Sequence, residues 1–107
     1  MKPPLFEYVT PPSLDAAIEA LTTYDSKAVL AGGQSLIPTL NFRLGTPDAI
    51  VDIGQVPGLR NIDFVDDKIK IGAMVRQRQV ELDSRIYKAN PLLREALSYV
   101  AHIPIRN

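Results

Sequence analysis

Cysteine is absent from the 107 residues, and histidine occurs once, at His102. Without a thiol the chain can form no disulfide, no thiolate metal site, no iron–sulfur ligation and no cysteine nucleophile. A lone histidine does not make the usual multi-ligand site for a transition metal. No nucleophile, base and acid are grouped in the sequence. We therefore expect no metal site and no catalytic residue in this chain.

A surplus of charge is also absent, because 12 lysines and arginines balance 12 aspartates and glutamates. Nucleic acid is therefore an unpromising partner, since phosphate backbones are bound by a basic excess. No apolar run reaches the roughly 18 residues of a membrane span, and the first ten residues do not resemble a signal peptide. We expect a cytoplasmic protein without a membrane span. Hydrophobic residues, at 46%, suit a folded domain.

The first half of the chain alternates between strand and helix patterns. Residues 5–9, 27–30 and 49–53 read as strands, and helical patterns follow the first two of them. Ser13 is the expected N-cap of the first helix. Its apolar stripe is predicted to be core and comprises Leu14, Ala17, Ile18 and Leu21. The alternation predicts parallel strands joined by right-handed helical crossovers.

The second helix of this half is predicted over residues 36–44. Leu36, Leu40 and Leu44 recur at helical spacing, and Pro38 falls in the first turn, where its missing N–H costs little. Gly45 is expected to end the helix with a positive φ.

The second half has a different pattern. Residues 61–65 and 68–71 alternate like a hairpin around Asp66 and Asp67, with one face buried. A helix is predicted over residues 80–88, and Asn90-Pro91 opens another with an apolar stripe. The stripe comprises Leu92, Leu93, Ala96, Leu97 and Val100. The charged residues before it predict a solvated helical face: Arg76, Arg78, Arg85, Glu81 and Asp83.

These patterns predict an α+β fold. Residues 1–57 form a small three-stranded parallel βαβαβ unit of α/β type, and residues 58–107 begin an antiparallel subdomain. A lone hairpin is marginal without further strands, and residues 103–107 look like the entry to another element, so we expect an incomplete domain. His102, just past a helix end, is expected to be a partner of the helix dipole or a surface residue.

The most informative stretch runs from Val29 to Leu36, where a strand enters a Gly32-Gly33 turn and a helix begins at once. Glycines leave no Cβ between amides and a ligand, and a helix start carries partial positive charge, which suits phosphate. Ser35 can donate to a phosphate or cap the helix. The turn lacks the third glycine of the Rossmann pattern and the lysine of a Walker loop, and a plain tight turn is the more frequent outcome of such a pattern alone.

Nearly the whole chain, in order, resembles a known family. The resemblance is carried by Phe6-Glu7-Tyr8, Ala31-Gly32-Gly33-Gln34-Ser35-Leu36-Ile37-Pro38, Val51-Asp52-Ile53, Ile71-Gly72-Ala73-Met74, and Ala101-His102 with Ile105-Arg106-Asn107. The family is the FAD-binding (medium) subunit of molybdenum hydroxylases of the carbon monoxide dehydrogenase and xanthine dehydrogenase type. It implies a flavin-binding fold of the vanillyl-alcohol-oxidase and para-cresol-methylhydroxylase type, truncated here.

The resemblance also implies roles. Amides around Gly32, Gly33, Gln34 and Ser35 would hold the FAD pyrophosphate, Ala31, Leu36 and Ile37 would line the site, and Ala101 and His102 would lie near the cofactor. FAD would pass electrons from iron–sulfur clusters on a small subunit to an acceptor, and the molybdenum cofactor would sit on a large subunit. The family's second motif, Thr-Ile-Gly-Gly, would follow Asn107, so the chain alone is expected to be inactive and to bind FAD weakly or not at all.

Two alternatives stay open. The first is an interaction module that keeps the fold without the cofactor. The second is a fragment of an oxidase of the same flavin fold that acts without molybdenum.

Overall fold

The computed structural model describes all 107 residues, which divide into two compact units, Met1–Gly58 and Leu59–Asn107. Each unit has its own sheet, three-stranded in the first and two-stranded in the second.

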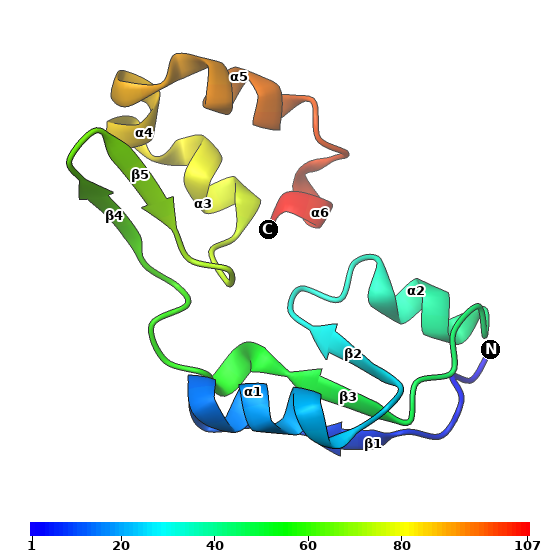
Figure 1. Cartoon of the computed structure of the whole chain (residues 1–107). Helices are drawn as coiled ribbons and strands as arrows, with labels where there is room; N and C mark the ends of the chain where they lie inside the picture. Colours follow the sequence, from blue (N-terminus) through cyan, green and yellow to red (C-terminus); the bar gives the residue numbers. More distant parts are fainter. The chain divides into compact units, whose positions relative to one another are not determined.

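The sheet of the first unit consists of β1 (Glu7–Val9), β2 (Lys27–Leu30) and β3 (Ala49–Asp52), in the order β1-β3-β2 (Figure 1). Both pairings are parallel, with Val9 and Val29 each opposite Val51. Ala49, Ile50 and Val51 are buried, because β3 has a strand on either side and helices above and below. The predicted parallel βαβαβ unit is confirmed.

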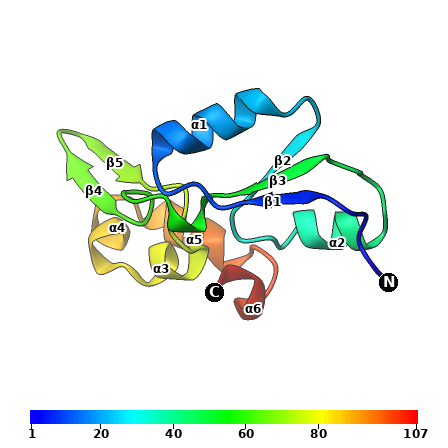
Figure 2. The ribbon, with the colours of Figure 1, turned by 90° about the horizontal axis from the view of Figure 1, so that it is seen from below.

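Helices α1 (Leu14–Thr23) and α2 (Leu36–Asn41) cover opposite faces of this sheet (Figure 2). The chain first crosses over β3 to reach β2 and then returns from β2 to β3. Two right-handed crossovers in opposite directions place their helices on opposite faces.

Helix α1 packs through small residues rather than through its largest ones. Its predicted cap is confirmed, since the Ser13 hydroxyl accepts a hydrogen bond from the Ala16 amide at 3.1 Å. Ala17 is 3% exposed, but Leu14 is 56% and Ile18 is 54% exposed. The core prediction is therefore wrong for these two. The helix turns its alanine side toward the sheet, and Ala17, lacking a long side chain, lets it lie close.

Helix α2 ends earlier than predicted. The Arg43 amide donates to Leu40 O and the Leu44 amide donates to Thr39 O, both at 3.0 Å, which is the bonding of a Schellman motif. Arg43 takes the left-handed position of this motif, with φ 54°. The prediction that Gly45 would end the helix with a positive φ is wrong, because Arg43 does so two residues earlier.

In the second unit, β4 (Ile62–Val65) and β5 (Lys68–Ile71) form the predicted antiparallel hairpin. Ile62 pairs with Ile71 and Phe64 pairs with Ile69, so all four share one face. Burial of this face is only partial, since Phe64 is exposed by 39%. The Arg85 guanidinium covers the Phe64 ring at 4.9 Å from its centroid.

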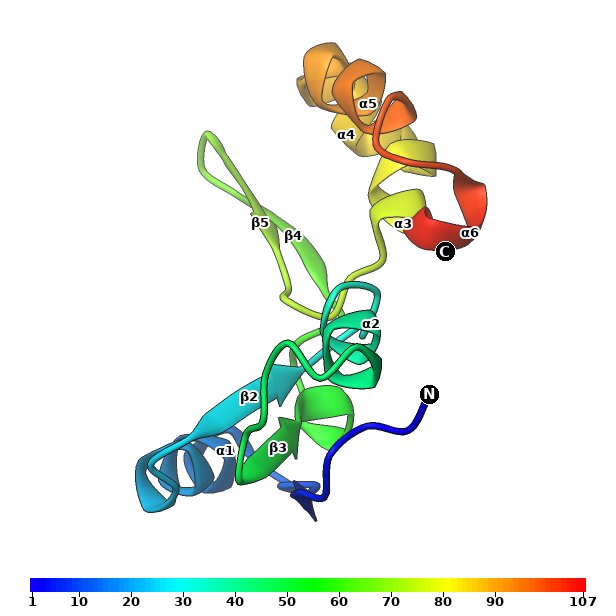
Figure 3. The same ribbon diagram turned by 90° about the vertical axis from the view of Figure 1, so that its right-hand side faces the viewer.

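Four helices follow the hairpin: α3 (Gln77–Leu82), α4 (Ser84–Ala89), α5 (Pro91–Ser98) and α6 (Ile103–Arg106). Figure 3 shows α3 and α4 beside α5, and α6 close to α3. The single helix predicted over 80–88 is wrong, because Asp83 divides it. The Asp83 carboxylate accepts hydrogen bonds from the amides of Arg85 and Ile86 and so begins a new helix.

The start of α5 is as predicted, with Asn90 Oδ1 accepting from the Leu93 amide at 3.4 Å and Pro91 in the first turn. Its stripe is only partly buried: Leu93 and Leu97 are half-buried, whereas Leu92 is 71% exposed. The buried apolar side chains of this unit are Val80, 5% exposed, and Ile86, which is fully buried.

Candidate functional site

The glycine turn joins the carboxyl end of β2 to α2 (Figure 1). Gly33 has φ +76°, the left-handed region that favours glycine. The backbone amides of Gly32, Gly33, Gln34 and Ser35 donate no hydrogen bond within the chain. Gly32, Gln34 and Ser35 are exposed and Gly33 is half-buried. The turn thus offers four consecutive N–H donors for a ligand that accepts hydrogen bonds.

The two glycines of the turn differ in their surroundings. A Cβ on Gly33 would lie 3.0 Å from Ile37 Cγ1 and 3.2 Å from Leu30 Cδ1. A Cβ on Gly32 would meet nothing within 4 Å. Gly33 is therefore required by the turn itself, whereas at Gly32 the protein leaves open space.

Ser35 stands at the start of α2 with an αR backbone, and its side chain makes no capping hydrogen bond. The capping alternative is therefore wrong. Its carbonyl accepts both the Thr39 amide and the Thr39 hydroxyl, and Gly33 O accepts the Ile37 amide. The first turn of α2 is built through these carbonyls, which leaves the Ser35 hydroxyl available.

Asp52 ends β3 opposite Leu30, the last residue of β2. One carboxylate oxygen accepts the Gly54 amide at 2.8 Å and begins the short 3-10 helix η1 (Ile53–Gln55). The other accepts the Tyr8 hydroxyl, a bond that raises the pKa of Tyr8 above its ordinary value. No sequence pattern indicates this pair, since its two members are 44 residues apart.

Ala101 and His102 lie in the second unit, between α5 and α6. Ala101 has φ +47°, and the amides of Ala101 and His102 also donate no hydrogen bond within the chain. His102 is exposed and precedes α6 without a side-chain cap. Of the two predicted roles, partner of the helix dipole or surface residue, it therefore has the second. The candidate residues thus form two sets, 31–37 and 101–102, one in each compact unit.

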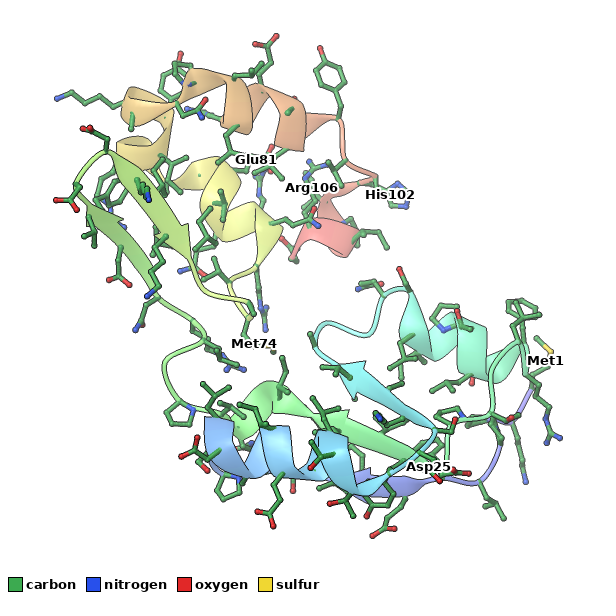
Figure 4. All side chains as sticks on the ribbon, viewed as in Figure 1. Met1, Asp25, Met74, Glu81, His102 and Arg106 are labelled. Carbon is green, nitrogen blue, oxygen red and sulfur yellow. The ribbon has the colours of Figure 1, made fainter.

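A buried ion pair adjoins the second set. Arg106 Nε donates to Glu81 Oε2 at 3.1 Å, and the same oxygen accepts from Arg78 Nη1 at 3.0 Å. In Figure 4 Glu81 and Arg106 point toward one another and the His102 ring points away. Arg106 and Glu81 are only 6% and 7% exposed.

The predicted solvated face is therefore wrong at Glu81. The hydrogen bond from Arg78 lowers the pKa of Glu81, and the charge of Arg106 adds to this against the opposing effect of burial. Sequence reasoning missed the pair because Glu81 and Arg106 are 25 residues apart and sit on helices too short to show a strong period.

These groups fit a diphosphate-bearing cofactor such as FAD. Four unpaired amides in a glycine turn suit phosphate oxygens, and the open space at Gly32 admits a ligand close to the backbone. The structure contains no group of three or more His, Cys, Asp or Glu side chains that could hold a metal ion. None of the helices has the length and apolar character needed to cross a membrane.

Comparison with known proteins agrees with this chemistry. The family described as "FAD binding domain in molybdopterin dehydrogenase" matches residues 4–107. The chain belongs to this family, as its resemblance to carbon monoxide dehydrogenase medium subunits implied, and FAD is the cofactor of such domains.

Individual relatives match along the whole chain. The 6-hydroxypseudooxynicotine dehydrogenase complex subunit alpha of Paenarthrobacter nicotinovorans is 44% identical over 108 residues, covering 100% of this chain and 36% of that protein. The carbon monoxide dehydrogenase medium chain of Hydrogenophaga pseudoflava is 38% identical over 109 residues, covering 100% and 38%.

Among solved structures, quinoline 2-oxidoreductase from Pseudomonas putida 86 superposes with a TM-score of 0.94 at 38% identity, covering 100% of this chain and 38% of that one. The fold is thus that of the FAD domains of these enzymes. The chain spans 36–38% of the length of these three proteins.

Proposed function

We propose that this chain holds FAD through the backbone amides of Gly32, Gly33, Gln34 and Ser35, with Ala31, Leu36 and Ile37 lining the site and Ala101 and His102 near the cofactor. The observation that carries the proposal is the set of four consecutive unpaired amides at the end of β2. Consecutive unpaired N–H groups in a glycine turn favour an anion, and a pyrophosphate carries several oxygens that can accept their hydrogen bonds.

Within a complete subunit, the bound FAD would supply redox chemistry, passing electrons from iron–sulfur clusters to an acceptor. The partners would be a large subunit with the molybdenum cofactor and a small iron–sulfur subunit. This part rests on the relatives, which include a dehydrogenase complex subunit and a carbon monoxide dehydrogenase medium chain. This chain would contribute binding and orientation and no catalytic side chain, and it would be inactive by itself.

The sharpest test is Gly32→Ala in the complete FAD subunit. Its φ is not positive and a Cβ there meets nothing within 4 Å, so alanine fits the fold. The added methyl group would instead stand where a phosphate approaches the amides. Losing one charge-assisted hydrogen bond costs about 1.5–3 kcal/mol, so we expect FAD affinity to fall roughly 10- to 100-fold. Equilibrium dialysis against FAD measures this.

Gly45→Ala is the matched control, because Gly45 also lacks a positive φ and has open space around it. It should leave FAD affinity unchanged. Gly33 would be a poorer choice, since its φ and its contact with Ile37 make any substitution strain the turn whether or not FAD binds. If Gly32→Ala and Gly45→Ala bind FAD equally well, the turn does not hold the cofactor. If the unchanged subunit binds no FAD at all, a cofactor-free interaction module becomes the better explanation.

A further inference from the structure

Arg106 has the most buried charged side chain of the second unit, and the proposed function gives it no role. Besides its ion pair with Glu81, its Nη1 donates to Val100 O at 2.7 Å and to Ala101 O at 3.3 Å. One guanidinium therefore connects α3 to two successive peptide carbonyls. Its planar fork of donors allows this, and a lysine ammonium could not reproduce it.

The direction of those carbonyls fixes the direction of two amides. In a trans peptide the C=O and the following N–H point to opposite sides. Since Val100 O and Ala101 O face the buried guanidinium, the N–H groups of Ala101 and His102 face away from it. Both amides are without an acceptor in the chain, and both residues are exposed.

The same contacts hold an unfavourable backbone in place. Ala101 has φ +47°, and an alanine in the left-handed region costs roughly 1–2 kcal/mol. A conformation of this kind persists only where surrounding contacts impose it. Arg106 supplies such contacts, and Glu81 anchors Arg106 from α3.

We propose that Arg106 is a positioning residue, which orients the peptides between Val100 and His102 so that the Ala101 and His102 amides can donate to oxygen acceptors of FAD. This inference rests on the proposed function. It goes further in assigning Arg106, anchored by Glu81, as the residue on which the second set of donors depends.

The test compares Arg106→Lys with Arg78→Gln in the complete FAD subunit. Arg106→Lys keeps a positive charge but loses the fork. Arg78→Gln removes the other partner of Glu81 and leaves the carbonyl contacts of Arg106 intact. We expect FAD affinity to fall about 10-fold in Arg106→Lys, as for loss of a charge-assisted hydrogen bond, and to change less than about twofold in Arg78→Gln.

Hydrogen exchange at the two amides separates positioning from stability. Saturating FAD should slow exchange of the Ala101 and His102 amides in the unchanged protein and in Arg78→Gln. In Arg106→Lys this protection should be lost even at saturating FAD, although amides of the glycine turn remain protected. Protection by ADP would identify the diphosphate as the acceptor, and protection by FAD but not ADP would place the acceptor on the ribityl chain or the flavin ring; either supports the proposal.

If Arg106→Lys does not fold, Glu81→Gln tests the proposal instead. It preserves the shape of the side chain and removes the charge that anchors Arg106, so protection of the two amides should weaken several-fold. Unchanged FAD affinity and unchanged protection in the folded variants would overturn the role of Arg106. Failure of the unchanged subunit to bind FAD would instead overturn the proposed function.

Discussion

The two compact units present unpaired amides by different physical means. In the first unit the turn follows a strand of a parallel sheet whose central strand is buried, and a positive-φ glycine makes the bend. In the second unit the left-handed residue is Ala101, and a buried arginine and glutamate stand beside it. The first arrangement depends on packing and on glycine, and the second on charge. The two units should therefore respond differently to substitution and to pH.

Packing is nevertheless decisive at one point in the second unit, and here we expect the largest effect. A Cβ on Gly72 would lie 2.3 Å from Leu59 O and 2.6 Å from Leu59 C. The two chain segments are tied together there, because Leu59 O accepts the Met74 amide at 2.7 Å and Asn61 O accepts the Gly72 amide at 2.9 Å. Gly72→Ala should destabilise the unit by at least about 3 kcal/mol, since backbone rather than a side chain must move.

Urea denaturation of the complete subunit measures this loss. Gly45→Ala again serves as the control and should change the free energy of unfolding by less than about 1 kcal/mol. Equal stability of the two variants would mean that the base of the hairpin yields easily, and the contrast between a packed and an ionic unit would need to be redrawn.

The ionic character of the second unit predicts an acid-sensitive stability. The hydrogen bond from Arg85 is the main cause that lowers the pKa of Asp83 to about 2, with the Ile86 and Arg85 amides adding to it. The folded state thus holds this carboxylate charged at pH values where the unfolded chain has already bound a proton. The stabilisation is complete above the ordinary pKa of 3.8 and is lost as pH falls from about 4 toward 2.

Asp83→Asn removes the titrating group and should flatten this part of the stability curve, measured by urea denaturation between pH 2 and 5. Arg85→Gln, which keeps the carboxylate but removes the main cause of the shift, should flatten it less. If Asp83→Asn loses stability toward low pH as steeply as the unchanged protein, Asp83 does not contribute to the acid limb.

Sequence reasoning succeeded where local pattern determines structure. The strand boundaries at 27–30, the Ser13 and Asn90 caps and the two-residue hairpin turn each follow from a few neighbouring residues. It failed where a competing local preference decided the outcome. Asp83 starts a new helix inside an apparently continuous one, and Arg43 adopts the left-handed position before Gly45 can.

Contacts between distant residues account for the other failures. The family resemblance indicated the candidate amides, but no periodicity shows that Arg106 is buried or that Glu81 pairs with it from 25 residues away. Leu14 and Ile18 share the spacing of a core stripe, yet the orientation of α1 is set by how closely Ala17 can approach the sheet. Pattern locates an apolar stripe, whereas packing decides which part of it is covered.

The smallest effect concerns the first unit, and it occurs at the opposite end of the pH scale. Tyr8 donates its hydroxyl proton to Asp52, and this bond is the main cause that raises the pKa of Tyr8. A raised pKa in the folded state gives a stabilisation that is complete below the ordinary value of 10 and is lost as pH rises through the folded value. Because Tyr8 is 56% exposed, solvent weakens the interaction and the effect should be modest.

Tyr8→Phe keeps the ring and removes the proton, so it should reduce the loss of stability as pH rises above 10, while leaving the acid limb set by Asp83 unchanged. The pKa of Tyr24 is also raised, mainly by a hydrogen bond to Glu7. Tyr24 should therefore cause part of the alkaline loss of stability that remains in Tyr8→Phe, and Tyr24→Phe should remove that part. An altered acid limb in Tyr8→Phe would show that the units do not respond to pH separately. An unchanged acid limb would assign the alkaline response to the sheet that supports the glycine turn and the acid response to the helices around Arg106.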